Sequence, residues 1–293
     1  MEEQNLSKSK KSTAVLIGTS TAFITSFSGS ALNLSIPDMG TYFNMGAASV
    51  GWLITAYSLI IAAFSVPFGK LADSTGRHRI LIMGIIAFGA ASLAAVFSAN
   101  AAVILFIRVI QALGAAMIFA TNMPIAISAF GGSERGKAIG MVTSGTYSGL
   151  ALGPVLGGIL NTYFGWKSIF IFGFLVSVFA LVITIKGLDK EELEPQSAKQ
   201  DIGGNILYIL MISSIIYGLT ALNSMSLGWL LIVAGVVFGV LFAITELKAE
   251  NPVIDVRIFA SDITYTLSNV TALFNYSATF ALGYLVSIYL QVV

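Results

Sequence analysis

The sequence predicts an all-α protein embedded in a lipid bilayer, and three observations lead to that class. Of the 293 residues, 56% are hydrophobic and only 10% are charged, whereas soluble domains carry about 25% charged residues. Apolar runs of the length that a helix needs to cross a bilayer recur along the whole chain. None of these runs alternates polar and apolar residues as the strands of a membrane barrel do.

Nine apolar segments qualify as membrane spans, with short polar breaks between them. They are 13–36, 49–70, 80–98, 101–125, 138–160, 168–187, 203–222, 227–246 and 264–292. The two longest breaks carry charges and proline, and they divide the chain into expected parts. These parts are a six-helix bundle over 1–187, a cytoplasmic linker over 188–202, two extra helices over 203–246, a cytoplasmic loop over 247–263 and a further helix over 264–293.

The distribution of lysine and arginine predicts how the spans are oriented. With the N-terminus in the cytoplasm, 13 of the 15 basic residues fall on the inner side, as the positive-inside rule expects. Trp52, Trp166 and Trp229 then all fall at the outer interface, where indole rings are enriched. We therefore expect a multi-pass protein of the plasma or inner membrane with a cytoplasmic N-terminus.

Two short segments suggest an internal repeat of opposite topology. GKLADSTGRHR at 69–79 lies in a predicted inner loop, and GGILNTYFGWK at 157–167 lies in a predicted outer loop. In both segments a glycine precedes a small polar or acidic residue by four positions, and a glycine and a cation follow. The first three and the next three helices therefore look like inverted copies, an arrangement that is typical of secondary transporters.

The loop at 69–79 carries the first family resemblance. Gly76 permits a tight turn and Gly69 allows close helix approach, while Asp73 can accept hydrogen bonds from Arg77. With Arg79, these residues resemble the signature loop of the major facilitator superfamily. The resemblance implies a cytoplasmic latch that forms and breaks as two helix bundles rock; the alternative is an ordinary basic loop with a turn.

A second resemblance lies within the fourth span. Arg108 and Gln111 fall on one helix face, and a cation within a span costs about 2.5–3.5 kcal/mol even on insertion scales. The segment Arg108–Ala116 resembles a motif of the same family, and the resemblance implies that both residues belong to the proton or substrate pathway. The alternative is that the arginine reaches the outer interface with its long side chain.

The fifth span carries the most specific match. Its small residues form a close-packing face, and a proline removes one backbone donor and bends the helix. The pattern resembles the motif of the antiporter branches, which implies export in exchange for protons; the alternative is a generic glycine packing face. The matching residues are Gly149, Gly153, Pro154, Gly157 and Gly158.

Two further segments, 33–37 and 251–259, resemble the fourteen-helix drug:proton antiporter branch. Many members of that branch have an acidic residue where this chain has Ser28. The resemblance also leads us to expect that this chain corresponds to the first nine of the fourteen helices in that branch. In that case the glycine face would meet lipid, the latch would lack its partner, and the chain alone would insert, self-associate and transport nothing.

The combined interpretation is a secondary transporter, a multidrug or antibiotic exporter that exchanges a lipophilic or cationic small molecule for protons. The expected substrate path is lined by Phe23, Ser28, Asn33, Tyr57 and Tyr147. Alternatives are a small-metabolite transporter of the same superfamily, a transport-inactive fragment and one half of a split pair. A membrane enzyme is disfavoured because the single histidine, His78, lies in a loop and no acidic pair lies at membrane depth. The net charge of +1 gives no sign of nucleic-acid binding, and the absence of cysteine excludes thiol-ligated metals; we expect no cofactor.

Overall fold

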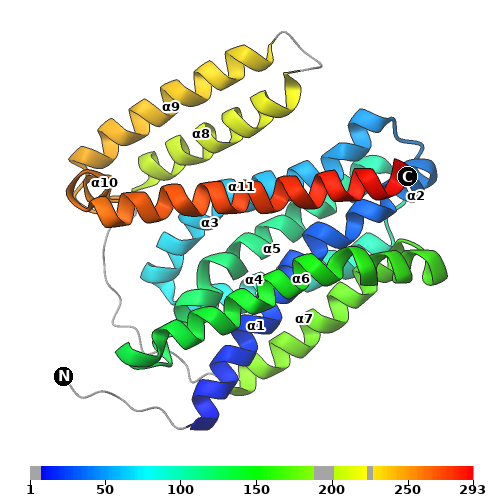
Figure 1. Ribbon diagram of the computed structural model, residues 1–293, viewed down its shortest axis with the longest axis horizontal. Helices are drawn as coiled ribbons and strands as arrows, with labels where there is room; N and C mark the ends of the chain where they lie inside the picture. The colour runs from blue at the N-terminus through cyan, green and yellow to red at the C-terminus, as the bar shows by residue number, and fades with distance from the viewer. Residues whose placement is uncertain (1–7, 188–200, 223–226, 293) are drawn as a thin grey trace.

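The computed structural model describes residues 8–187, 201–222 and 227–292, and within these ranges the regular structure is entirely helical (Figure 1). The helices are α1 (Lys8–Ala31), η1 (Leu32–Ser35), α2 (Ile36–Phe43), α3 (Ala47–Thr75), α4 (Arg77–Val96), α5 (Ala101–Ser128), η2 (Gly132–Glu134), α6 (Arg135–Phe164), α7 (Lys167–Gly187), α8 (Ile202–Ala221), α9 (Gly228–Lys248), α10 (Arg257–Ser261) and α11 (Ile263–Val292). A helix therefore occupies each of the nine predicted spans. The predicted linker lies mostly outside the described residues, and the division into parts stays a prediction.

Seven stretches of the described chain are long and apolar enough to cross a membrane. They are Lys10–Phe43, Ser49–Thr75, Arg77–Val96, Ala101–Ser128, Lys167–Gly187, Ile202–Ala221 and Gly228–Lys248. Helices α6 and α11 occupy the two other predicted spans, and each is 30 residues long, more than a bilayer crossing requires. The protein is thus a multi-pass membrane protein.

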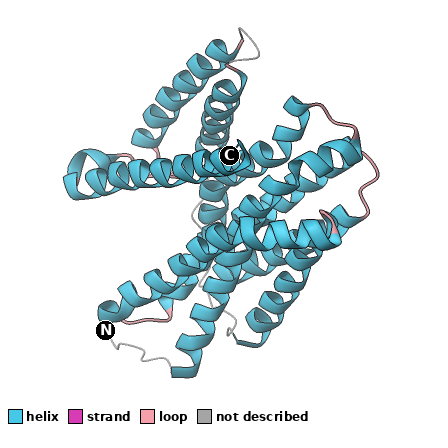
Figure 2. Ribbon diagram, turned by 45° about the vertical axis from the view of Figure 1, so that its right-hand side comes forward, coloured by secondary structure: helices cyan, strands magenta, loops and turns pink. Residues whose placement is uncertain are grey.

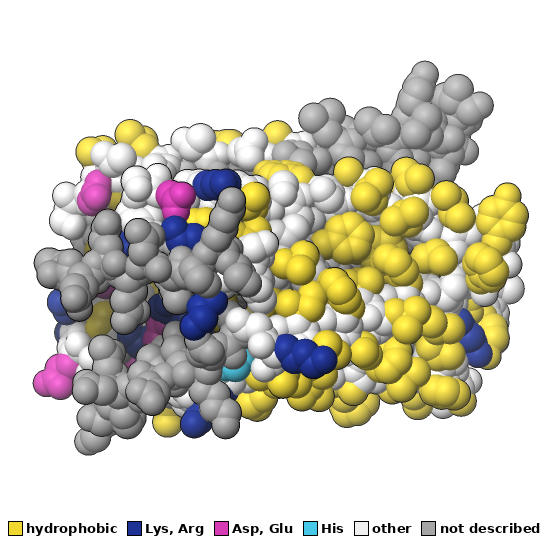
Figure 3. All heavy atoms as spheres, turned by 90° about the horizontal axis from the view of Figure 1, so that it is seen from below, with side chains coloured by type: hydrophobic (Ala, Val, Ile, Leu, Met, Phe, Trp, Pro, Cys, Tyr) yellow, Lys and Arg dark blue, Asp and Glu magenta, His cyan; other side chains and the backbone are white. Residues whose placement is uncertain are grey.

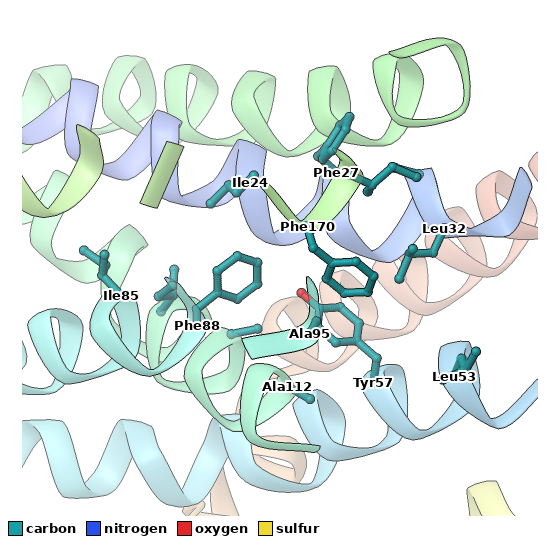
Figure 4. Close-up of a cluster of buried hydrophobic side chains, with 14 of the residues drawn as sticks. Ile24, Phe27, Leu32, Leu53, Tyr57, Ile85, Phe88, Ala95, Ala112 and Phe170 are labelled. Atoms are coloured by element: carbon teal, nitrogen blue, oxygen red, sulfur yellow. The ribbon is translucent and has the colours of Figure 1, made fainter. Parts of the chain in front are cut away.

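Helices α1 to α7 form one bundle around a shared core. Helix α1 packs on α5, α6 and α7, while α4 packs on α5 and α7. Phe27 of α1, Phe88 of α4 and Phe170 of α7 are fully or almost fully buried in that core, and Figure 4 shows side chains from these helices filling the space between the ribbons. The core therefore lies between the helices. Many other large apolar side chains are exposed on the outer surface of the molecule.

Helices α8 and α9 form a hairpin beside this bundle (Figures 1 and 2). The two helices approach closely at Gly218 and Gly235, because these residues have no side chain. A Cβ at either position would clash with the partner helix. The hairpin docks through α8 onto α3, where the Tyr208 hydroxyl donates to the carbonyl of Ala62 at 3.3 Å. The rings of Trp52 and Tyr217 also lie 5.2 Å apart across this junction.

The glycine face of α6 packs against α1, which corrects the expectation that this face meets lipid. A Cβ on Gly145 would lie 2.5 Å from the Thr19 carbonyl oxygen, and one on Gly157 would lie 2.7 Å from that of Ala31. The Ser30 hydroxyl also donates to the Gly149 carbonyl at 3.2 Å. The small residues of α6 therefore pack against α1 inside the bundle, and a serine hydroxyl of α1 forms a hydrogen bond across this contact.

Charged side chains gather at one end of the molecule, and apolar ones cover most of the remaining surface in the same view (Figure 3). We call the end that carries the 69–79 loop and the start of α6 the charged end. Helices α3, α7 and α9 all begin at the opposite end (Figure 1), so the three tryptophans lie there together. Trp166, however, is buried among the rings of Tyr42, Phe43 and Phe170.

Candidate transport site

Arg108 lies at the centre of a buried polar cluster within the seven-helix bundle. Its side chain is 0% exposed, so it does not reach the surface, and the alternative of an interfacial arginine is wrong. Its Nε donates to the Leu53 carbonyl at 3.1 Å, and one terminal nitrogen, Nη1, donates to the Ser28 hydroxyl at 3.4 Å and to the Gln111 side-chain oxygen. Three helices thus converge on a single cation.

Tyr57 completes the cluster from α3. Its ring lies under the guanidinium, with 4.3 Å between the Arg108 Cζ and the ring centroid, and such stacking stabilises a cation more when the pair is desolvated. The Tyr57 hydroxyl donates to the Thr25 carbonyl of α1 at 2.9 Å. Figure 4 shows Tyr57 extending from α3 toward Phe170 and into the core.

Gln111 links Arg108 to α4. Its amide nitrogen donates to the Ser92 hydroxyl at 2.7 Å, and that hydroxyl donates to the Phe88 carbonyl at 2.7 Å. The link needs α4 and α5 to lie close together, and Gly114 provides this, because a Cβ there would lie 2.6 Å from the Phe88 amide nitrogen.

One donor of the cluster is left without a partner. The Arg108 Nη2 is buried and makes no hydrogen bond, and no carboxylate among the described residues forms an ion pair with this arginine. A buried cation is stable only when it is paired or well hydrogen-bonded, so this unpartnered nitrogen is the part of the site best suited to an acceptor group from outside.

The predicted path residues divide into two groups. Ser28 and Tyr57 are brought together with Arg108 and Gln111. Phe23 is half-buried and stacks on Phe27, while Asn33 lies exposed in the short helix η1. Tyr147 is half-buried on α6, and its hydroxyl interacts with Tyr276 of α11. These three side chains make no described contact with the arginine.

The sequence reasoning missed three members of the site, which are Ser92, Thr25 and the Leu53 carbonyl. A lone serine in the glycine- and alanine-rich stretch of α4 was the one available signal, since it is the only polar residue on that turn. Carbonyl groups carry no sequence signal at all.

The latch loop has part of its predicted geometry. Asp73 accepts from Arg77 Nε at 2.9 Å, as expected, and Gly76 ends α3 with a φ of 111°, which favours glycine. Arg79 is exposed. Gly69 differs from expectation, because a Cβ there would meet no atom within 4 Å; in this structure it does not serve close helix approach.

An ion pair at the charged end joins α1 to the short helix η2, which precedes α6. Lys11 contacts Glu134 at 2.6 Å and lies 5.6 Å from the centroid of the Phe130 ring. The hydrogen bond from this lysine holds the pKa of the Glu134 carboxyl below its usual range.

A family model described as Major Facilitator Superfamily matches residues 19–293. The chain belongs to this superfamily. It therefore shares its family with membrane transporters, and the expected fold class is confirmed.

Relatives within the family have names that refer to different small molecules. The riboflavin transporter RibZ of Clostridioides difficile is 32% identical over 92% of this chain and 58% of its own length. The multidrug resistance protein Stp of Mycobacterium tuberculosis is 28% identical over 89% of this chain and 49% of its own length. The methyl viologen resistance protein SmvA of Salmonella typhimurium is 32% identical over 79% of this chain and 48% of its own length. The chain thus spans about half the length of the curated relatives it matches.

Solved structures share the fold at low sequence identity. A bacterial homologue of the human lysosomal transporter Spinster, in an inward-facing and occupied conformation, matches with a TM-score of 0.56 at 17% identity, over 85% of this chain and 64% of its own. The POT family transporter PepTSo matches with a TM-score of 0.56 at 14% identity, over 78% of this chain and 51% of its own. At these identities the likeness concerns the fold alone.

Proposed function

We propose that the chain takes part in export of small organic molecules across the cell membrane in exchange for protons, and that the Arg108 cluster is part of the substrate and proton pathway. The observation that carries the proposal is the fully buried arginine with one terminal nitrogen lacking a partner. An intramembrane charge is costly and marks a pathway more often than it contributes stability.

Arg108 has the role of a fixed positive charge in this proposal. Arginine keeps its proton in proteins, so it does not carry the transported proton itself. Its free N–H groups bind an acceptor oxygen of the substrate, and its charge keeps protons out of the bundle while the site is empty. Gln111 and Tyr57 hold the guanidinium in the orientation that leaves Nη2 available.

Two observations support export rather than uptake. The α6 segment from Gly149 to Gly158 resembles the antiporter motif, and it packs along α1, the helix that supplies Ser28 to the cluster. The names of Stp and SmvA associate two relatives with resistance to drugs or toxic cations. The charge distribution supports an inner-membrane protein with its charged end, and its N-terminus, in the cytoplasm.

A second candidate is transport of a small metabolite rich in hydrogen-bond acceptors. The same unpartnered Nη2 favours it, because an arginine donor suits carbonyl or anionic groups. No carboxylate contacts this arginine among the described residues, so the cluster itself offers a dication no counter-charge. The riboflavin transporter among the relatives makes a flavin the first metabolite to test.

The experiment measures accumulation of methyl viologen and riboflavin in cells that express the complete reading frame of this chain. Arg108→Ala should abolish energy-dependent export, and the exposed-site control Arg135→Ala should leave it at the wild-type level. Arg108→Lys should also transport poorly, because an ammonium lacks the planar fork of donors. Normal export by Arg108→Ala, with equal amounts of protein in the membrane, would overturn the assignment.

A further inference from the structure

Glu246 is a fully buried acidic residue that the proposed transport site does not use. It lies near the end of α9, its side chain is 0% exposed, and it is the one acidic side chain that is buried among the described residues. Its Oε2 accepts the backbone amide of Ile254 at 3.0 Å. Its Oε1 is buried and has no hydrogen-bond partner, although a buried oxygen without a partner is costly, and more so when it is charged.

A second carboxylate faces this unpartnered oxygen. Asp201 caps α8, and its Oδ1 accepts the Gly204 amide at 2.8 Å. A Cβ on Gly204 would overlap Oε1 of Glu246 and would stand 2.9 Å from Oδ2 of Asp201. Both oxygens therefore lie beside the same glycine, and both are acceptors, so what the arrangement lacks is a donor between them.

We propose that Asp201 and Glu246 form a proton-binding site at the charged end of the α8–α9 hairpin, in which a proton on Oε1 of Glu246 is donated in a hydrogen bond to Oδ2 of Asp201. The charged groups that act on Glu246 are Asp201 and, from α3, Lys70, and the segment that follows α9 contributes the backbone amides of Val253 and Ile254. With one proton the pair has a net charge of −1, which Lys70 balances. Without it, the negative charges of the buried Glu246 and the half-buried Asp201 lie together against a single cation, an arrangement that proteins avoid by retaining a proton.

The bound proton stabilises the connector that leads from α9 to α10. We call residues 249–256 the connector. Glu246 holds it through the Ile254 amide, and Arg257 returns to α9 by donating to the Leu247 carbonyl at 2.7 Å. When the proton is lost, the two carboxylates repel each other. Glu246 then moves away from Gly204, and its hydrogen bond with the connector amide is broken. The site thus couples proton occupancy to docking of the connector, whatever the substrate is.

The chain contains no cysteine, so a single introduced thiol reports docking without background. Val253→Cys places the thiol on the half-buried part of the connector, and Asn251→Cys places it on an exposed position two residues earlier. The ratio of their maleimide labelling rates in purified protein cancels the pH dependence of the thiol reaction. We expect the ratio to rise with pH as the proton is lost, by up to about tenfold per pH unit, as linkage to one proton requires.

Three variants test the assignment of this pH dependence. Glu246→Gln imitates the protonated acid, so the ratio should stay low and independent of pH. Asp201→Asn keeps a good helix cap but removes the opposing charge, so it should also flatten the profile. The exposed Glu250→Gln in the same connector should behave as wild type. A flat profile in the two cysteine variants with no other change, or an unaltered profile after both Glu246→Gln and Asp201→Asn, would overturn the proposal. Because labelling requires no transport, this result is independent of the proposed function.

Discussion

Replacement of Gln111 by leucine should destabilise the bundle chiefly because it removes one hydrogen-bond partner of the buried Arg108 guanidinium. The Gln111 side chain has a size close to that of leucine, so the substitution opens little cavity. It removes a hydrogen bond to a charged donor, worth about 1.5–3 kcal/mol, and a neutral one to Ser92, worth about 1 kcal/mol. We expect a loss of about 3 kcal/mol, which corresponds to about 6–12 °C in the melting temperature at the 2–4 °C per kcal/mol found for large domains.

A double-mutant cycle with Arg108→Met isolates the charged part of this cost. When the cation is absent, Gln111→Leu removes only the bond to Ser92 and should cost about 1 kcal/mol. The coupling between the two positions is therefore about 2 kcal/mol. Melting of the detergent-purified variants, followed by intrinsic fluorescence at one fixed heating rate, measures the four corners of the cycle. Additive shifts in melting temperature would refute the reasoning that Gln111 acts through the buried guanidinium.

Three other predictions concern the frame around the site. Gly149→Ala should destabilise the α1–α6 contact by about 1–3 kcal/mol, because the new Cβ would overlap the Phe23 carbonyl, whereas Gly140→Ala on the same helix meets open space and should stabilise slightly; melting temperatures distinguish the two. The pKa of Glu134 is lowered by Lys11, so its contribution to stability is present above the ordinary carboxyl pKa and is lost as pH falls through the lowered one; Glu134→Gln should lack this acid-dependent part of the melting profile, and an unchanged profile would contradict the ion pair. A reporter fused after Gly76 should read cytoplasmic and one after Gly165 external, and the opposite result at either place would contradict the proposed orientation.

The helices and the central part of the site could be predicted because their signals are local. An apolar run of about 20 residues in a chain with 10% charged residues has few alternatives to a membrane helix. An arginine inside such a run must find partners within the protein, and Gln111 on the same helix face was the nearest candidate. Ser28 and Tyr57 were expected as lining of a substrate path, and their contact with the arginine was not predicted.

The errors concern which surfaces meet, and a single sequence does not encode that. The glycine stripe of α6 showed that something packs closely there, but not that the partner is α1. Gly69 has a pattern suited to close approach, yet its surroundings in this structure are open. Glu246 was not singled out because an acid two residues before a helix end resembles an ordinary interfacial residue; only the packing of α8 and the connector buries it.

The central claim is that substrate movement is coupled to protons through the Arg108 cluster. It is tested most directly in proteoliposomes that contain the protein expressed from its complete reading frame, with a pH gradient imposed across the membrane and followed by a pH-sensitive dye. Addition of riboflavin or methyl viologen should dissipate the gradient in wild-type and Arg135→Ala vesicles and leave it intact in Arg108→Ala vesicles. Substrate movement that proceeds at the same rate with and without the gradient, or that continues in Arg108→Ala vesicles, would contradict the account.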